Sequence, residues 1–164
     1  MRPPFRVAAA AALLLAAPAA MADDYAAPDG LVDAQILVAG PSDCESMVEI
    51  HRGAEKLGSA DYRSDDHEHG ECVDQASWTA DSKFFVFSLE NAGGHQSWNA
   101  HVIVFSRETG RFLELERSLK DPITSSAFTL SAPDIVEVEI TELPLDDSHK
   151  PHRQIIKLGT LSAQ

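Results

Sequence analysis

The chain has 164 residues and carries 26 acidic side chains against 13 basic ones, which gives a formal net charge of −13 at neutral pH. This length corresponds to about one domain. A chain this acidic is not expected to bind nucleic acid or anionic lipid, because both are held through Lys and Arg contacts to phosphate. The charge favours solubility, cationic partners and metal cations instead.

Residues 1–22 have the three parts of a secretory signal peptide. Two arginines precede an apolar run over residues 7–17, and Ala20-Met21-Ala22 is a small-x-small cleavage site. The run is too short to span a bilayer, which takes roughly 20 apolar residues. We therefore predict cleavage after Ala22, a periplasmic or secreted product, and no membrane insertion of the mature chain. No cysteine lies near the site, so a lipid anchor is not expected.

The two cysteines of the chain are Cys44 and Cys72. An even number of cysteines in an exported protein favours a disulfide over free thiols or metal thiolates. The chain-entropy model gives such a crosslink a stabilisation of roughly 3.5 kcal/mol.

The segment before the first cysteine divides into two parts. Residues 23–34 are polar, and we interpret them as a flexible lead-in to a β-rich domain over residues 35–164. Gln35–Ala39 predicts a short strand that Gly40-Pro41 ends.

Residues 42–58 fit two patterns. Ser42 with Glu45 three residues later is a capping-box signature, and an apolar stripe follows it, which favours a helix. Against the helix, Gly53 in its middle would cost about 1 kcal/mol relative to Ala. Alternation around Val48 and Ile50, with a turn at Gly53, favours a hairpin, and the hairpin is the preferred interpretation.

Three strand patterns follow one another between Phe84 and Glu116. In residues 84–89 and 101–106 apolar side chains fall on both faces, which is typical of strands covered on both sides. Arg111–Glu116 continues the pattern after a turn in which Gly110 takes the position that most often needs a positive φ. We expect these segments to form the centre of an antiparallel sheet.

The last third of the chain predicts further strands at residues 128–131, 135–143 and 153–158. Residues 135–143 alternate between apolar and acidic side chains, so one face of this strand is expected to meet water. No long helix is predicted after residue 60. The sequence therefore predicts a single all-β antiparallel domain, sandwich-like or blade-like, of about seven to nine strands.

Residues 78–88, Trp-Thr-Ala-Asp-Ser-Lys-Phe-Phe-Val-Phe-Ser, resemble the opening of a WD40-like propeller blade of exported bacterial proteins. Ser82 stands where such blades have a turn glycine. At ~40–45 residues a blade, the 142 residues that remain after removal of residues 1–22 (164 − 22) supply about three blades, and a closed propeller has at least about four. The resemblance thus implies blade-like hairpins and not a propeller. Together with residues 93–98, the stretch also resembles a group of small uncharacterised exported bacterial proteins, which implies no activity.

The polar segment 61–74, expected as an exposed loop or the rim of a strand, contains His67, His69 and Glu71. On an extended segment these three residues would share a face. Imidazole and carboxylate groups are ligands of Zn²⁺ and Cu²⁺, so the sequence predicts a candidate metal site here, next to Asp65 and Asp66. The alternative is a solvated acidic loop with no ligand.

The loop 91–99 joins two central strands and is a candidate recognition loop. Gly93-Gly94 allows a tight backbone, and a tryptophan beside polar donors is typical of binding surfaces. The predicted partner-binding residues are His95, Gln96, Trp98 and Asn99. The alternative is a plain connection with Trp98 packed against the sheet edge. If the two loops meet, His95 and His101 would add metal ligands.

No nucleophile elbow and no phosphate-binding glycine loop occurs in the sequence, so enzymatic activity is not favoured. The leading hypothesis is an exported non-enzymatic binding protein that holds a protein or small ligand, with a cationic partner favoured by its charge. The loop 91–99 and the acidic surface would make the contacts. The alternative hypothesis is a divalent metal-binding protein that uses the loop 65–72.

Overall fold

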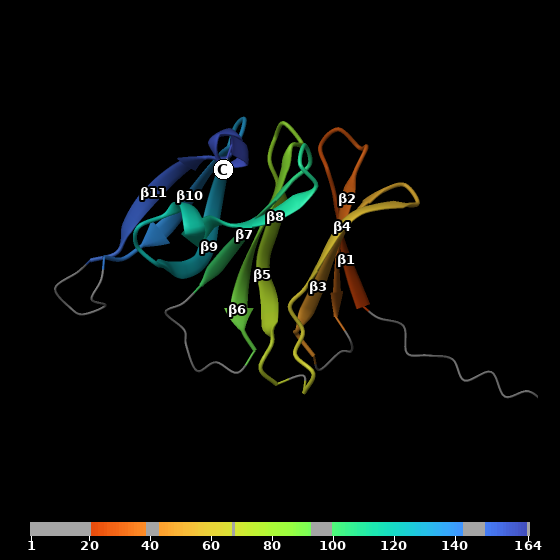
Figure 1. Ribbon diagram of the computed structural model, residues 1–164, viewed down its shortest axis with the longest axis horizontal. Coiled ribbons are helices and arrows are strands. Elements are labelled where there is room, and N and C mark those ends of the chain that lie inside the picture. The colour runs from red at the N-terminus through yellow and green to blue at the C-terminus, as the bar shows by residue number, and fades with distance from the viewer. Residues whose placement is uncertain (1–20, 39–42, 67, 93–99, 143–149, 164) are drawn as a thin grey trace, which may run out of the picture.

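The computed structural model describes residues 21–38, 43–66, 68–92, 100–142 and 150–163. These residues form three antiparallel sheets that follow one another along the chain and stand side by side (Figure 1). Two short 3-10 helices, η1 (Leu115–Ser118) and η2 (Leu158–Ala163), complete the described structure. Within it, no helix has the length and apolar character that a membrane span requires.

Each sheet is a meander in which neighbouring strands are consecutive in the chain. The first sheet consists of β1 (Met21–Ala26), β2 (Asp33–Val38), β3 (Ser46–Arg52) and β4 (Glu55–Asp61). The central sheet consists of β5 (Glu71–Trp78), β6 (Phe84–Asn91), β7 (His101–Ser106) and β8 (Arg111–Glu114). The third sheet consists of β9 (Ile123–Ser131), β10 (Ile135–Ile140) and β11 (His152–Lys157).

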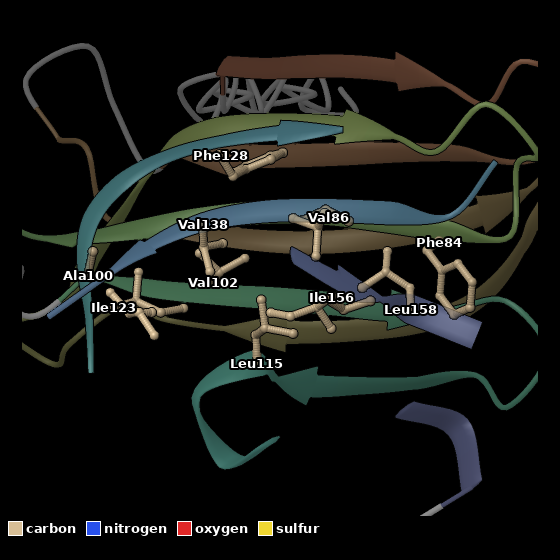
Figure 2. Packing of buried hydrophobic residues seen from close by; sticks show 13 residues of the cluster. Phe84, Val86, Ala100, Val102, Leu115, Ile123, Phe128, Val138, Ile156 and Leu158 are labelled. Carbon is tan, nitrogen blue, oxygen red and sulfur yellow. The ribbon is translucent and has the colours of Figure 1, made fainter. Parts of the chain in front are cut away.

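The central sheet is covered on both faces. On β6, Phe85 and Phe87 belong to the apolar cluster shared with the first sheet, whereas Phe84 and Val86 belong to the cluster shared with the third sheet. Figure 2 shows this second cluster, where Val102 of the central sheet lies among side chains of the third. The two-sided apolar pattern of β6 and β7 therefore predicted their position correctly.

The all-β fold predicted from the sequence is confirmed, and so are several local features. The described part of residues 42–58, from 43 on, contributes the β3–β4 hairpin and contains no helix, with Gly53 at a φ of 58° in the turn. Gly110 has a φ of 67°, as its turn requires. The described residues form no closed ring of blades, in agreement with the expectation from chain length.

One expectation about the strands was wrong, and one strand was not foreseen. Residues 23–34 are not a flexible lead-in, because β1 pairs with β2 along its whole length, from Met21 opposite Val38 to Ala26 opposite Asp33. The segment 71–78 is a full strand, β5, although it lacks a clear apolar pattern. The structure accordingly has more strands than predicted. Residues 1–20 lie outside the described residues, so cleavage after Ala22 stays a prediction.

The strands run between two ends of the stack, which differ in the length of their connections. At the upper end in Figure 1, the turn end, short turns at residues 27–32, 53–54, 79–83, 107–110 and 132–134 join the strands. At the lower end, the loop end, longer connections follow strands β2, β4, β6, β8 and β10.

Ser82 joins the first sheet to the central sheet at the turn end. It has a φ of 61°, the left-handed conformation in which related turns carry glycine. Its hydroxyl accepts a hydrogen bond from the backbone N–H of Asp29 at 3.0 Å, and Arg107 binds the Asp29 carboxylate. Serine thus supplies an intersheet contact that glycine would lack.

Candidate functional site

A disulfide ties the first sheet to the central sheet at the loop end. Cys44 precedes β3 and Cys72 lies in β5, with their Cα atoms 5.0 Å apart. Glu45, next to Cys44, forms an isolated β-bridge with Cys72. The predicted crosslink is therefore confirmed, and it joins sheets that share an apolar core.

The Glu45 side chain organises the loop between β4 and β5. It is fully buried, and its carboxylate accepts hydrogen bonds from the backbone N–H groups of Ser64 at 2.7 Å and Gly70 at 2.6 Å. The single proton of the Ser64 hydroxyl is shared between this carboxylate, at 2.9 Å, and that of Asp66, at 2.8 Å. A Cβ atom on Gly70 would lie 2.5 Å from the Glu45 carboxyl carbon, so this approach requires glycine. Sequence reasoning gave Glu45 only a helix-capping role and missed this one.

Asp66 orders the exposed part of the same loop. Its carboxylate accepts hydrogen bonds from the Ser64 hydroxyl at 2.8 Å and the Glu68 N–H at 3.1 Å, and it lies 2.7 Å from Nδ1 of His69. These bonds, with that from Ser64 the strongest, lower the pKa of Asp66. The same contact with Asp66 raises the pKa of His69.

The structure bears on the predicted metal ligands only in part. His67 lies outside the described residues, His69 is in a bend, and Glu71 is the first residue of β5. The extended segment thus starts at Glu71, whereas the expectation of a shared face required it to include His67 and His69. In the described part of the chain no group of three His, Cys, Asp or Glu side chains is placed to hold a metal ion. Metal binding by His67, His69 and Glu71 stays a prediction.

The predicted recognition residues His95, Gln96, Trp98 and Asn99 also lie outside the described residues. The strands that this loop connects are described, however. β6 ends at Asn91 and β7 begins at His101, both at the loop end.

A cluster of titratable side chains lies where β5, β7 and η1 meet. Nε2 of His101 is 3.6 Å from a Glu71 carboxylate oxygen, and Nδ1 of His101 is 3.4 Å from Oε1 of Glu116. His101 pairs with Leu89, which belongs to the core shared with the first sheet, so His101 points to that side. The three side chains are 20–34% exposed, which leaves the cluster open to solvent at its edge.

Glu116 is held in place by the backbone. Its Oε1 accepts a hydrogen bond from the N–H of Val102 at 2.9 Å. Its Oε2 is buried and makes no hydrogen bond within the described residues. Buried carboxylate oxygens usually have a partner, so this atom is an acceptor that the described contacts leave unused. The sequence gave no signal for Glu116, because its contacts depend on η1 turning back onto β7.

The pKa values in the cluster depend on one another. The hydrogen bond to Glu116 raises the pKa of His101, with further contributions from Glu71 and Glu114. Burial raises the pKa of Glu71, while His101 acts in the opposite direction. Burial, together with the charges of Glu71 and Glu114, raises the pKa of Tyr62. We call these five residues the His101 cluster.

A cavity of about 250 Å³ adjoins the cluster through Glu114, which lines both. Phe112, Leu113 and Leu161 make its apolar wall, and Arg117 binds Glu114 at its rim through two hydrogen bonds of 2.8 and 3.0 Å. An apolar wall beside carboxylates suits a side chain with an aliphatic stem and a cationic head.

Charge is unevenly distributed between the two ends. In the loop-end connections and the two strand residues next to each, the described acidic residues are Asp43, Glu45, Asp61, Asp65, Asp66, Glu68, Glu71, Glu90, Glu114, Glu116, Asp121, Glu139 and Glu142, and the basic ones are Arg63, Arg117, Lys120, Lys150 and Arg153. By the same rule the acidic residues at the turn end are Asp29, Asp33, Glu55, Asp81, Glu108 and Asp134, and the basic ones are Arg52, Lys56, Lys83, Arg107, Arg111 and Lys157. The negative charge is therefore concentrated at the loop end, and the turn end is nearly balanced.

Comparison with known proteins gives no family assignment. No family model and no curated protein matches the chain. The fold is similar to a crystal structure described as "a putative conserved lipoprotein" from Clostridium novyi NT, with 15% sequence identity and a TM-score of 0.49. The similarity covers 87% of this chain and 90% of that one. At this level it carries no inference about activity, partner or lipid attachment.

Proposed function

We propose that this protein is an exported, non-enzymatic binding protein that holds a cationic partner at its loop end. The observation that supports the proposal best is the His101 cluster, in which Glu71, Glu114 and Glu116 surround one half-buried imidazole. Carboxylates in such a place accept charge-assisted hydrogen bonds, which are stronger than neutral ones. Their attraction to a cation is also less screened than at an open surface.

The partner proposed is a Lys- or Arg-containing segment of a basic protein. Its cationic heads would bind the carboxylates of the cluster, and an aliphatic stem would lie along Phe112, Leu113 and Leu161 of the adjacent cavity. The wider excess of acidic residues at the loop end would steer such a partner toward this end. Because the loop 91–99 leaves from the same end, its predicted contacts His95, Gln96, Trp98 and Asn99 fit the same partner.

The compartment is extracytoplasmic, in agreement with the Cys44–Cys72 disulfide, since such crosslinks persist where the environment is oxidising. The predicted signal peptide supports a location in the periplasm or the medium. The partner would be a basic protein of that compartment.

The proposal is tested by titrating hexalysine into the wild-type protein and into Glu71→Gln/Glu116→Gln. Both changes keep a hydrogen-bond acceptor and remove a charge. We expect the affinity to fall by about tenfold or more, which corresponds to about 1.4 kcal/mol. The matched control is Glu55→Gln/Glu108→Gln, which removes the same charge at the turn end. Equal losses in both variants would mean that hexalysine responds only to net charge, and the proposal would be wrong.

A second candidate is divalent metal binding by His67, His69 and Glu71. The observation in its favour is the loop itself, which Glu45 fixes while the His69 side chain remains 71% exposed. Thermal melts with EDTA and then with Zn²⁺ or Cu²⁺ test it, because a ligand at 100 times its Kd stabilises by about 2.7 kcal/mol. A shift that His69→Ala abolishes and His51→Ala retains would support the metal site. Unchanged melts would exclude it.

A further inference from the structure

We infer that the cationic ligand of the loop end competes with the proton on His101, so that binding strengthens as His101 becomes neutral. This inference rests on the proposed function and adds to it the regulation of the site. It follows from the position of one imidazole between two carboxylates that come from different elements, Glu71 from β5 and Glu116 from η1.

The protonated imidazole fits this position better than the neutral one. A protonated histidine has two N–H donors, and both ring nitrogens of His101 face a carboxylate, at 3.6 and 3.4 Å. A neutral histidine has one donor and one lone pair, so one carboxylate would face the lone pair. His101 therefore acts as an internal cation when it is protonated, and it occupies the carboxylates that a ligand would need.

Among the groups of the His101 cluster, the imidazole is the one that we expect to change charge near neutral pH. Glu71, Glu114 and Glu116 face it from β5, β8 and η1, and Glu114 is also bound to Arg117. Tyr62, beside Glu71 and Glu114, has its pKa raised by burial and stays neutral. Histidine is the side chain that ordinarily changes charge between about pH 5 and 8. Loss of its proton thus leaves the carboxylates without their resident cation.

Partial exposure makes the exchange possible. The side chains of His101, Glu71 and Glu116 are 34%, 27% and 20% exposed, so a cationic head reaches them from solvent without opening the core.

Competition of this kind is reciprocal. If removing the proton from His101 strengthens ligand binding, then the ligand must lower the pKa of His101 by the corresponding factor. The two effects are measured independently, one by the affinity and one by the titration of the imidazole.

The first measurement is the affinity for hexalysine, with its α-amino group acetylated, between about pH 5 and 8, a range in which the lysine side chains stay charged. In the wild type we expect the affinity to rise by about tenfold over this range. In His101→Gln, which has no titrating group at this position, the rise should be much smaller, with only the contribution of Glu71 left, whose pKa is raised by burial. The control is His51→Gln, because His51 lies 3.0 Å from Glu49 at similar burial on the first sheet, and this variant should retain the rise. A full rise in His101→Gln would overturn the inference.

The second measurement follows the assigned His101 resonance by NMR in the wild-type protein, with and without hexalysine, and needs no variant. We expect the ligand to shift the titration of His101 to lower pH. Hexalysine binding with an unchanged His101 titration would overturn this inference and leave the proposed function standing. Absence of binding at every pH would overturn both.

Discussion

The turn end and the loop end of the sheet stack both hold the first sheet against the central sheet, but they do so through different contacts. At the turn end, short turns, nearly balanced charges and the contact of Ser82 with Asp29 hold the first and central sheets together. At the loop end, longer connections carry an excess of carboxylates, and the same two sheets are joined by a disulfide and a buried carboxylate. Ordering longer connections costs more entropy, and like charges repel, so the loop end needs the stronger ties.

The two ends also differ in the role that we infer for their residues, stability at the turn end and binding at the loop end. The turn end shows contacts that hold the sheets and little that would attract a ligand. The loop end concentrates charge in a way that opposes folding, because like charges at close range destabilise the compact state. Such a concentration is expected where binding requires it, and the disulfide and Glu45 offset its cost. The contrast predicts that removing the disulfide or Glu45, the two ties of the loop end, has a larger effect on stability than removing the Ser82 contact at the turn end.

The largest effect is expected from removing the disulfide. Cys44→Ser/Cys72→Ser should lower the free energy of unfolding by about 3.5 kcal/mol, because the two cysteines lie 28 residues apart and the crosslink restricts the unfolded chain. Denaturant titration of oxidised wild type and variant measures it. A change below about 1 kcal/mol would mean that Glu45 and the apolar core hold the two sheets without the crosslink.

The next effect is expected at Glu45. Glu45→Ala should cost about 3 kcal/mol, because it leaves the buried donors of Ser64 and Gly70 without their acceptor. Hydrogen exchange should show loss of protection at these two N–H groups, while the N–H of Asp29 at the turn end stays protected.

A double-mutant cycle with Gly70→Ala sharpens this result. Alone, Gly70→Ala should destabilise, because its Cβ would lie 2.5 Å from the Glu45 carboxyl carbon and 2.6 Å from the Tyr62 carbonyl oxygen. In the Glu45→Ala background the first clash is gone, so the added cost should be smaller. Additive costs would show that the Tyr62 carbonyl alone makes glycine necessary.

The fold was predictable where side-chain pattern and local backbone agree. The two-sided apolar runs of β6 and β7, and the glycines at 53 and 110, each carry their signal within a few residues. β1 and β5 lack such a signal. Their pairing is set by partners elsewhere, β2 (Asp33–Val38) for β1 and the apolar β6 for β5, so polar composition alone gave the wrong interpretation for residues 23–34.

The candidate site was predictable only in fragments. Glu71 and His101 were singled out as metal ligands, and the structure brings these two together with Glu116 in a different combination. Glu45 and Glu116 could not be assigned, because each acts through contacts that the folded sheets create. Glu45 meets Gly70 across a separation of 25 residues, and Glu116 meets Val102 across 14.

A smaller effect is expected at the turn end, from Ser82. Ser82→Ala should cost about 1 kcal/mol, because it removes the acceptor for the Asp29 N–H and keeps a Cβ at a φ of 61°. Ser82→Gly removes the same acceptor but relieves the backbone, so it should cost less. Thermal or denaturant unfolding of the two variants separates the loss of the hydrogen bond from the strain of the backbone. If Gly costs more than Ala, the entropy of the unfolded chain outweighs the strain at this turn.

The smallest effect is expected at His101, and it depends on pH. The pKa of His101 is raised in the folded state, so its ion pairs add stability that is fully present below its ordinary pKa of about 6.5 and is lost as pH rises through the folded pKa. His101→Gln should therefore melt below the wild type at about pH 5, and the two curves should converge at alkaline pH. A difference that is constant across pH would mean that the imidazole contributes packing and not charge. In that case His101 would not act as a cation toward Glu71 and Glu116, and these carboxylates would be equally available to a ligand at every pH.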